Sequence, residues 1–280
     1  VAACARHTAA PGMLGVHVAL VAVSTCVPPG VPLSQRLHNV QAAARLQTLG
    51  FERAVPQSAA TLSSKRRDIV VCCHGTPDPV VRGRFNLNNL PTGRVDLLAR
   101  CASSALFLSH GVRRNTRLWL VFQDHEASVC INGQKVRGLH PDERTIAAAL
   151  KRTLAVAHGA TGRADSDDGW SFHSGGLAAR LDALMSDRGC EPKRLIQLHE
   201  AGEIPLRAAL HPDANHPVEY DDVVLVFGDQ LGFTVKESKQ IAQRGGVQAH
   251  IGPASLLTSH CIVLAHHACD TASEPVFAQQ

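Results

Sequence analysis

Short runs of apolar residues alternate with longer stretches in which apolar side chains recur every three or four positions. The first run, residues 69–73, is continuously apolar, which is typical of a strand buried on both faces. Further strands are predicted at residues 118–122, 195–198, 223–227 and 247–251. Because these strands alternate with helical stretches, the pattern predicts an α/β fold with a largely parallel sheet.

Two of the helical stretches are long and well marked. From Arg94 onward, apolar residues return at helical spacing, and Gly111 suits the end of that helix. A second helix is predicted to begin at Pro141, with Asp142 and Glu143 in the first turn, where the helix dipole favours acids. Its apolar face is expected to consist of Ile146, Ala149, Leu150 and Leu154.

Local turn and cap signals mark the remaining boundaries. Asn132 and Gly133 predict the turn of a hairpin that follows the strand at 118–122, and residues 159–169 have the composition of a surface loop. Ser174 is the expected cap of a leucine-rich helix. Thr234 and Glu237 predict a capping box for a helix that ends before residue 245, and a last helix is predicted around residues 261–264.

Length and composition narrow the functional classes. The chain has 280 residues, of which 45% are apolar, so it can bury a sizeable core and is not disordered throughout. Its net charge of +4 excludes a uniformly basic nucleic-acid coat, and an anionic partner therefore needs a local patch. The longest apolar stretch, residues 13–29, has polar interruptions and is shorter than the roughly 20 residues of a membrane span, so no membrane segment is expected.

Neither disulfide nor metal chemistry is expected. Nine scattered cysteines without CxxC pairs are typical of reduced core thiols. The densest group lies on one predicted helix and cannot converge on one ion, so no metal site is predicted. This group consists of His260, Cys261, His266, His267 and Cys269. GxGxxG, GxxxxGK[ST], HExxH and GxSxG motifs are absent, which argues against the commonest nucleotide-binding and hydrolase classes.

The first 66 residues are set apart from the fold. No acidic residue precedes Glu52, although several arginines do, and this bias is typical of an organelle-targeting segment. An unstructured extension or an upstream gene-model error explains it equally well, since Pro28, Pro29 and Pro32 interrupt any long helix. The predicted organisation is an N-terminal extension at 1–66, one α/β domain at 67–272 and a tail at 273–280.

Arginines are concentrated between residues 81 and 117. Seven of them accompany a single acid, Asp96, which gives the segment a local net charge of +6. Arginine makes bidentate contacts with phosphate, so the segment predicts an RNA-backbone patch, with a solvated helix face as the alternative. The arginines expected to contact RNA are Arg82, Arg84, Arg94, Arg100, Arg113 and Arg114, and the seventh is Arg117.

Three apolar strands of the C-terminal half lead into distinctive loops. The loops lie at residues 198–203, 227–232 and 251–253, and each contains glycine. Ligands of open parallel sheets bind beyond the carboxyl ends of the strands, and glycine lets the backbone approach a ligand closely. The loops therefore predict a small-ligand pocket, with ordinary tight turns as the alternative.

Several blocks of sequence resemble one enzyme family. They run in the family's order: FNLNNLP (85–91), GRVDLL (93–98), RC (100–101), ALFLSHGVRR (105–114), PDER (141–144), LHE (198–200), GDQLG (228–232), IGP (251–253) and CI (261–262). Together they closely resemble the archaeal tRNA pseudouridine-54 N1-methyltransferases, which belong to the SPOUT class. The first 66 residues lie outside this resemblance.

The resemblance implies a fold, a cofactor and partners. It implies an α/β domain with helices on both faces of the sheet, a C-terminal trefoil knot, a homodimer, a tRNA substrate and S-adenosylmethionine as methyl donor. The residues that it places against S-adenosylmethionine are Leu198, Gly228, Ile251, Gly252, Pro253, Ala254, Ser255, Leu256 and Cys261. The chain departs from the family at His250 and Gln230, which affects the expected substrate choice more than cofactor binding.

The reaction requires removal of a proton from N1 of pseudouridine. Asp96 is the carboxylate within the basic segment and is the expected proton acceptor; capping of a helix start is its alternative role. The pair Asp142 and Glu143 is the next candidate, and Cys261 is expected to line the pocket rather than to act as a nucleophile.

Two other functions remain open at this stage: methylation of ribosomal RNA, and a catalytically silent RNA-binding homodimer. Gly228, Gly232 and Gly252 favour an enzyme, because a silent relative has no need of backbone room for a cofactor. A cytoplasmic location is expected, or an organellar one if residues 1–66 are a transit peptide.

Overall fold

The computed structural model describes residues 66–161, 168–187, 194–210 and 222–271. All of them belong to one compact unit, Ser58–Gln280. The N-terminal extension expected at 1–66 lies outside the described residues except for Arg66, and so does the expected tail at 273–280.

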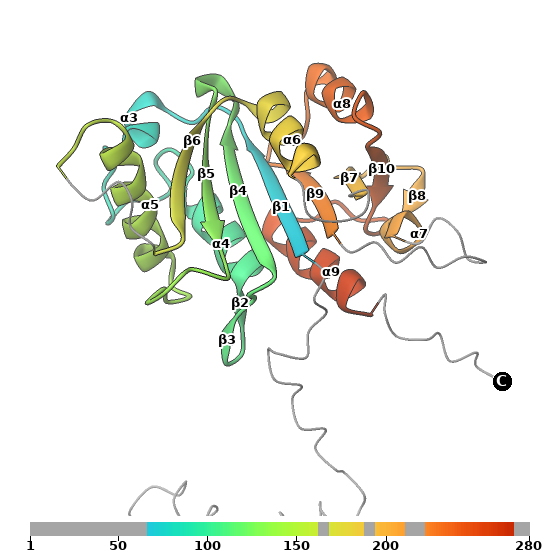
Figure 1. Ribbon diagram of the computed structural model, residues 1–280, viewed down its shortest axis with the longest axis horizontal. Coiled ribbons are helices and arrows are strands. Elements are labelled where there is room, and N and C mark those ends of the chain that lie inside the picture. Colours follow the sequence, from blue (N-terminus) through green and yellow to red (C-terminus); the bar gives the residue numbers. More distant parts are fainter. Residues whose placement is uncertain (1–65, 162–167, 188–193, 211–221, 272–280) are drawn as a thin grey trace, which may run out of the picture. The chain divides into compact units, whose positions relative to one another are not determined.

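An eight-stranded sheet forms the centre of the domain, in the order β6-β5-β4-β1-β9-β7-β10-β8 (Figure 1). Its strands are β1 (Arg66–Cys73), β4 (Thr116–Phe122), β5 (Ala127–Asn132), β6 (Trp170–Ser174), β7 (Arg194–Leu198), β8 (Ile204–Pro205), β9 (Asp222–Gly228) and β10 (Val247–His250). Only β5 runs against its neighbours; all other pairings in this sheet are parallel. The predicted α/β class with a largely parallel sheet is confirmed.

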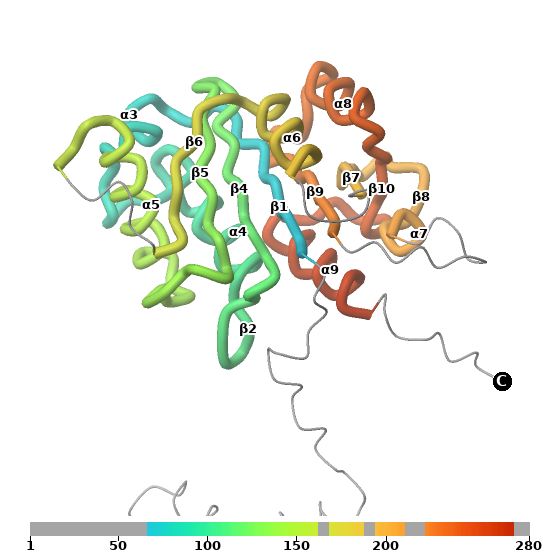
Figure 2. The backbone as a smooth tube through the Cα atoms, in the orientation of Figure 1, coloured from blue at the N-terminus to red at the C-terminus, as the bar shows by residue number. Residues whose placement is uncertain are grey.

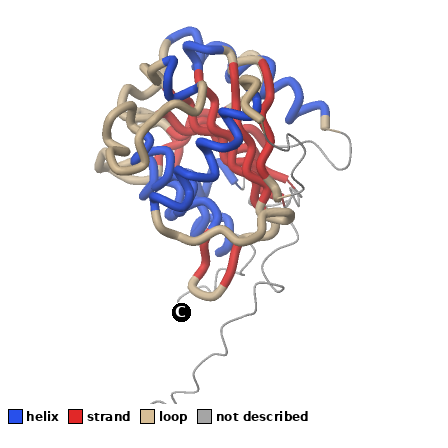
Figure 3. Tube along the Cα trace, turned by 90° about the vertical axis from the view of Figure 1, so that its left-hand side faces the viewer, coloured by secondary structure: helices blue, strands red, loops and turns tan. Residues whose placement is uncertain are grey.

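Helices cover both faces of this sheet (Figure 3). Successive side chains of a strand point to opposite faces, so Ile69 and Val71 of β1 enter one core while Val70 and Cys72 enter the other. The first core is closed by α4 (Val95–Leu106), α5 (Glu143–Ala157) and α9 (Thr258–Thr271). The second is closed by α6 (Leu177–Ser186) and α8 (Val235–Ala242).

Three further helical segments of the described chain are short. They are α3 (Asp78–Val81), η1 (Gln123–His125) and α7 (Leu206–Leu210). Among the described residues, no helix is both long and apolar enough to cross a bilayer.

The helix predicted to run from Arg94 to Gly111 ends earlier, at Leu106. Phe107 adopts an extended conformation, and β2 (Phe107–Leu108) pairs with β3 (Gly111–Val112) in a small hairpin. Phe107 and Val112 are partly buried against the first core, so the apolar residues that suggested more helix are used by the hairpin instead. Figure 2 shows this hairpin projecting from the body of the domain.

Two further boundaries differ from the prediction. The hairpin after β4 turns through residues 123–126, with Glu126 in the left-handed region at φ 45°, whereas Asn132 ends β5. Gly133 instead passes close to Arg113: a Cβ at this glycine would lie 2.0 Å from the Arg113 carbonyl oxygen. Ser174 is the last residue of β6 and not a helix cap; Gly176 occupies the cap position of α6 without a side-chain bond.

The capping box predicted for α8 is confirmed, with Thr234 and Glu237 bonding each other reciprocally. The helix predicted to begin at Pro141 begins at Glu143 instead. Asp142 is its N-cap and accepts a hydrogen bond from the Thr145 N–H.

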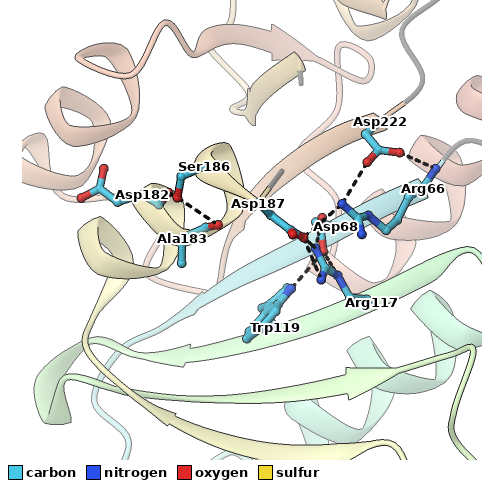
Figure 4. Close-up of polar contacts among 9 residues, drawn as sticks. All are labelled: Arg66, Asp68, Arg117, Trp119, Asp182, Ala183, Ser186, Asp187 and Asp222. Atoms are coloured by element: carbon cyan, nitrogen blue, oxygen red, sulfur yellow. Dashed lines mark hydrogen bonds and ion pairs between the residues drawn. The ribbon is translucent and has the colours of Figure 1, made fainter. Parts of the chain in front are cut away.

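Charged side chains tie the amino-terminal edge of the sheet together (Figure 4). Arg117 donates to both oxygens of buried Asp68, at 2.6 and 2.8 Å, and the Trp119 indole N–H donates to the same carboxylate at 3.0 Å. Arg66 reaches Asp187 at 3.1 Å and Asp222 at 3.0 Å. Arg117 and Trp119 lie two residues apart on β4, so both side chains face the same carboxylate, and this end of the sheet is held by an ion pair and a further hydrogen bond.

Candidate functional site

The three predicted loops meet at the carboxyl edge of the sheet. Leu198, the last residue of β7, lies opposite Phe227 of β9 on one side and Ala249 of β10 on the other. Parallel register therefore delivers the chain after β7, β9 and β10 to one place. The Thr258 hydroxyl at the start of α9 donates to the Gly228 carbonyl at 2.7 Å and joins this helix to the loop after β9.

A cavity of about 660 Å³ opens at this edge. All of the predicted cofactor residues line it except Pro253. Seven further lining residues lie within the predicted loops 198–203 and 227–232: His199, Glu200, Phe227, Asp229, Gln230, Leu231 and Gly232. The lining residues that the sequence did not assign to the ligand pocket are Arg94, Leu97, Arg100, Phe233, Leu257, Thr258, Ser259 and His260. Most of them share a positional signal, because they lie at or directly after a strand end or at the start of α4 or α9.

The cavity suits S-adenosylmethionine in size and lining. Small-ligand sites typically occupy about 300–1,000 Å³ and combine apolar walls with a few polar groups. Apolar walls come from Leu198, Ile251 and Leu256. A Cβ built on Gly252 meets no atom within 4 Å, so the backbone there borders open space that a ligand can occupy.

Gly228 lines the cavity and is also required by the fold of its own loop. A Cβ at this position would lie 2.7 Å from the backbone carbon and oxygen of Gly232. The loop from Gly228 to Gly232 is therefore tight, and glycine is required by the fold of the loop itself.

Arg94 and Arg100 border the same cavity from α4. Arg94 caps the helix with φ 58°, a left-handed conformation that is uncommon for a residue other than glycine. Asp96 lies between them, with Arg100 Nη2 2.8 Å from its Oδ2 and Arg94 Nε 3.4 Å from its Oδ1. Asp96 Oδ1 is buried and accepts no hydrogen bond from the described residues. Asp96 itself does not line the cavity.

The predicted RNA-binding arginines divide into two groups in space. Arg82, Arg84 and Arg94 are exposed and Arg100 is partly exposed, all on the segment from the end of β1 to the first two turns of α4. Arg113 and Arg114 follow the hairpin beyond the other end of α4. A helix of 12 residues spans about 18 Å, so the arginines do not form one continuous patch.

Arg113 and Arg114 have partners within the domain. The Arg113 guanidinium is largely buried and donates to both oxygens of Asp270, at 3.2 and 2.7 Å. Arg114 is exposed as a residue but donates to the Gly133 and Val136 carbonyls. These contacts give both arginines a role in the fold.

The remaining sequence candidates also have defined places. Asp142 caps α5 and is exposed, and Glu143 lies 3.9 Å from Arg100. Burial raises the pKa of the Cys261 thiol, which keeps it protonated and unsuited to nucleophilic attack. Within the part of the chain that the structure describes, no three His, Cys, Asp or Glu side chains gather as metal ligands would.

Comparisons with known proteins agree with this geometry. Residues 51–274 match the model of a family described as SAM-dependent RNA methyltransferases. The tRNA (pseudouridine(54)-N(1))-methyltransferase of Halobacterium salinarum is 36% identical over 210 residues, covering 74% of this chain and 97% of the relative. The enzyme of the same name from Methanosarcina mazei is 34% identical over 211 residues, covering 74% and 92%.

A solved structure shares the fold. Nep1 of Archaeoglobus fulgidus, crystallised with S-adenosylhomocysteine, superposes with a TM-score of 0.50 at 12% identity, covering 74% of this chain and 98% of that one. At this identity the likeness concerns the fold alone. The matches to the family model and to the curated relatives span most of this chain, which therefore belongs to the family of SAM-dependent RNA methyltransferases.

Proposed function

We propose that this chain transfers a methyl group from S-adenosylmethionine to N1 of pseudouridine 54 in tRNA. The observation that carries the proposal is the cavity at the carboxyl edge of the sheet, bordered by the predicted cofactor loops and by Arg94 and Arg100. Membership of the methyltransferase family and the names of its curated relatives support the same substrate.

The chain's own residues divide the work of this reaction. Leu198, Ile251, Leu256 and the backbone near Gly252 hold the cofactor, which when bound supplies an electrophilic methyl group on sulfur. Arg94 and Arg100 bind RNA phosphates at the mouth of the cavity. Asp96, held between these arginines, accepts the N1 proton, so that the nitrogen attacks as an anion.

Nucleoside mass spectrometry tests the reaction and its target together. The purified chain and S-adenosylmethionine are incubated with tRNA that carries pseudouridine at position 54, with the same tRNA carrying uridine there, and with a pseudouridine-containing rRNA fragment. N1-methylpseudouridine should form only in the first RNA. Product only in the rRNA fragment would move the substrate to rRNA, and RNA binding without any product would favour a silent RNA-binding protein.

We further infer that the chain acts as a homodimer. Leu256, Leu257, Val263 and Leu264 are exposed on and before α9, beside the cofactor loops. Leu256 and Leu257 also line the cavity, whereas Val263 and Leu264 do not, and exposed large apolar side chains favour burial against a partner. Sedimentation equilibrium should give twice the mass of the chain, and Val263→Asp should yield monomers.

The trefoil knot is a separate proposal. It is supported by β10 lying between β7 and β8, and by the return of the chain from β10 to α9, which packs on α4 and α7. An experimental electron-density map that traces residues 199–221 relative to 251–257 would decide it. We also propose a cytoplasmic location. Imaging of the tagged full chain tests this, and a signal from an organelle would contradict it.

A further inference from the structure

His74 directly follows β1 and lies between two buried carboxylates. Its Nδ1 is 3.1 Å from Asp229 Oδ1, and its Nε2 is 2.8 Å from Glu237 Oε1. The His74 backbone N–H also donates to Asp229 Oδ2 at 2.6 Å. The exposed fractions of these side chains are 11% for His74, 3% for Asp229 and 7% for Glu237. The sequence placed Asp229 in a predicted ligand loop and Glu237 in a predicted capping box, but it gave no sign that His74 joins them.

The hydrogen-bond geometry favours a positive charge on the imidazole. Each ring nitrogen faces a carboxyl oxygen, and an ionised carboxylate can only accept, so with both carboxylates ionised both nitrogens donate and the ring is an imidazolium. Burial alone would lower the pKa of His74, but the hydrogen bonds to Glu237 and Asp229 outweigh it and raise that pKa above the ordinary 6.5. One positive charge thus sits between two negative ones with little water.

Other hydrogen bonds of the two carboxylates reach into the cavity wall. Asp229 Oδ1 also accepts from the Leu231 N–H at 2.9 Å, and Glu237 Oε2 accepts from the Thr234 N–H and hydroxyl at 2.7 and 2.9 Å. Gly228, Asp229, Gln230, Leu231, Gly232 and Phe233 all line the cavity. His74 therefore connects the end of β1 to Asp229 within this wall and, through Glu237, to Thr234, which directly follows the wall.

Charged and titratable groups reach this position from several elements. Asp229 comes from the loop after β9 and Glu237 from α8. The Asp124 carboxylate, from the turn after β4, accepts the neighbouring Gly75 N–H at 2.7 Å. The Cys72 thiol on β1 has a raised pKa through burial and the nearby Glu237, and remains neutral. The surroundings are acidic, so they stabilise an imidazolium and disfavour its loss.

We propose that His74 is a positioning residue for the methyl donor: as a bridge between Asp229 and Glu237 it fixes the wall from Gly228 to Phe233 in its binding conformation. The proposal rests on the proposed function, because it assigns S-adenosylmethionine to this cavity. When the ring loses its proton, one of the two nitrogens faces a carboxylate without a hydrogen, and the wall loses one anchor.

The expected pH dependence has a definite sign. The bridge is complete at low pH and is lost as pH rises through the raised pKa of His74. Affinity for the cofactor should therefore fall on the alkaline side of about pH 6.5, the ordinary pKa of histidine.

The test measures binding of S-adenosylhomocysteine by calorimetry at a series of pH values. The full chain is compared with His74→Gln and, as a matched control, with His158→Gln, whose imidazole contacts the Leu154 carbonyl and the Phe172 ring and does not line the cavity. His74→Gln should bind about tenfold more weakly near pH 6, the effect expected for loss of a hydrogen bond to a charged group. Its affinity relative to the parent should recover as pH rises, while His158→Gln should match the parent throughout.

Each outcome has one meaning. If the parent chain does not bind S-adenosylhomocysteine at all, the proposed function fails. If the parent binds and His74→Gln binds equally well at every pH, or more weakly by a factor that pH does not change, the positioning role is overturned. If circular dichroism shows that His74→Gln does not fold, Asp229→Asn is measured in its place. The ratio of its affinity to that of the parent must then change with pH, and a constant ratio would overturn the proposal.

Discussion

Gly228 and Gly252 both border the cavity, yet their roles differ at the level of single atoms. A side chain at Gly228 would collide with the backbone of Gly232, whereas one at Gly252 meets no protein atom within 4 Å. Gly252 has no positive φ, so a substitution there is not strained. A loss of cofactor binding at Gly252 therefore reports on the cavity, and a loss at Gly228 reports on the fold of the loop.

The first prediction follows from this difference. Gly252→Val should lower the affinity for S-adenosylhomocysteine at least about tenfold, because the isopropyl group occupies space that the ligand needs. Its thermal midpoint should stay near that of the parent. Gly111→Val is the control, since Gly111 also has open space around its Cβ but lies in β3, away from the cavity. Unchanged affinity in Gly252→Val would remove this loop from the cofactor site.

Asp96 is the residue on which the proposed chemistry depends. Asp96→Asn keeps the shape of the side chain and should leave cofactor affinity unchanged, while the single-turnover rate falls by roughly two to four orders of magnitude. The deficit should shrink at alkaline pH, where the substrate nitrogen ionises without help. Rapid-quench kinetics at two pH values measures this. A rate within a few-fold of the parent would leave Asp96 as a helix-start acid and shift attention to Glu143, beside Arg100.

At the scale of elements, α9 is fastened to β1 and to the hairpin by one carboxylate. Asp270 accepts from Arg67 at 2.7 Å and from Arg113, and buried His266 accepts from Arg67 and donates to the Ala105 carbonyl. Burial, with Arg113 and Arg67 nearby, lowers the pKa of His266 to about 3. Burial would raise the pKa of Asp270, but the hydrogen bond from Arg113 and the charge of Arg67 lower it.

Asp270→Asn should accordingly destabilise the fold by about 2–3 kcal/mol, less than the roughly 3–5 kcal/mol of a fully buried pair, because the Asp270 side chain is 23% exposed. Urea unfolding measures the change. Asp182→Asn is the control. The Asp182 side chain, which pairs with Arg244, is 64% exposed, so its loss should lower the free energy of unfolding by about 1 kcal/mol or less. Equal losses in the two variants would contradict a central role for Asp270.

The same network fixes the sign of an acid effect. Both groups have pKa values below those of the unfolded chain, so the unfolded state binds more protons and stability falls as pH decreases. The contribution of His266 is lost from its unfolded pKa of 6.5 down to about 3, and that of Asp270 below 3.8.

At the scale of the whole molecule, the arginines determine how RNA approaches. Arg84 and Arg94 are exposed at the end of the domain that carries the cavity, whereas Arg113 is committed to Asp270. Substitution of Arg113 would therefore change the stability of the fold as well as RNA binding, and the two effects could not be separated. Arg94→Gly is especially suitable, because glycine adopts φ 58° without strain and the variant should be no less stable than the parent.

Arg84→Ala combined with Arg94→Gly should weaken tRNA binding and reduce the slope of log affinity against log salt by up to about 2 units, or roughly one unit for each phosphate contact. Filter binding at several salt concentrations gives the slope. Arg244→Ala, on the face covered by α6 and α8, should leave both affinity and slope unchanged. An unaltered slope in the double variant would show that tRNA does not lie over this end of the domain.

Features governed by neighbours in the sequence were predictable. The buried run at 69–73, an acid in the first turn of α5 and the capping box of α8 each depend on residues within one or two turns, and each is present. The end of α4 was not predictable in this way. The spacing of Phe107 and Val112 is compatible with a helix, but both residues belong to the β2–β3 hairpin, which packs on the core.

The sequence alone determined the α/β class, the glycine-containing loops and, through resemblance, the family and its cofactor. Only the tertiary structure decided which of the arginines share a surface, since α4 separates Arg94 from Arg113 by its own length. It also brought His74, Asp229 and Glu237 together from three parts of the chain. Parallel strands bring the ends of β1, β9 and β7 side by side whatever the chain length between them, and that adjacency leaves no local trace in the sequence.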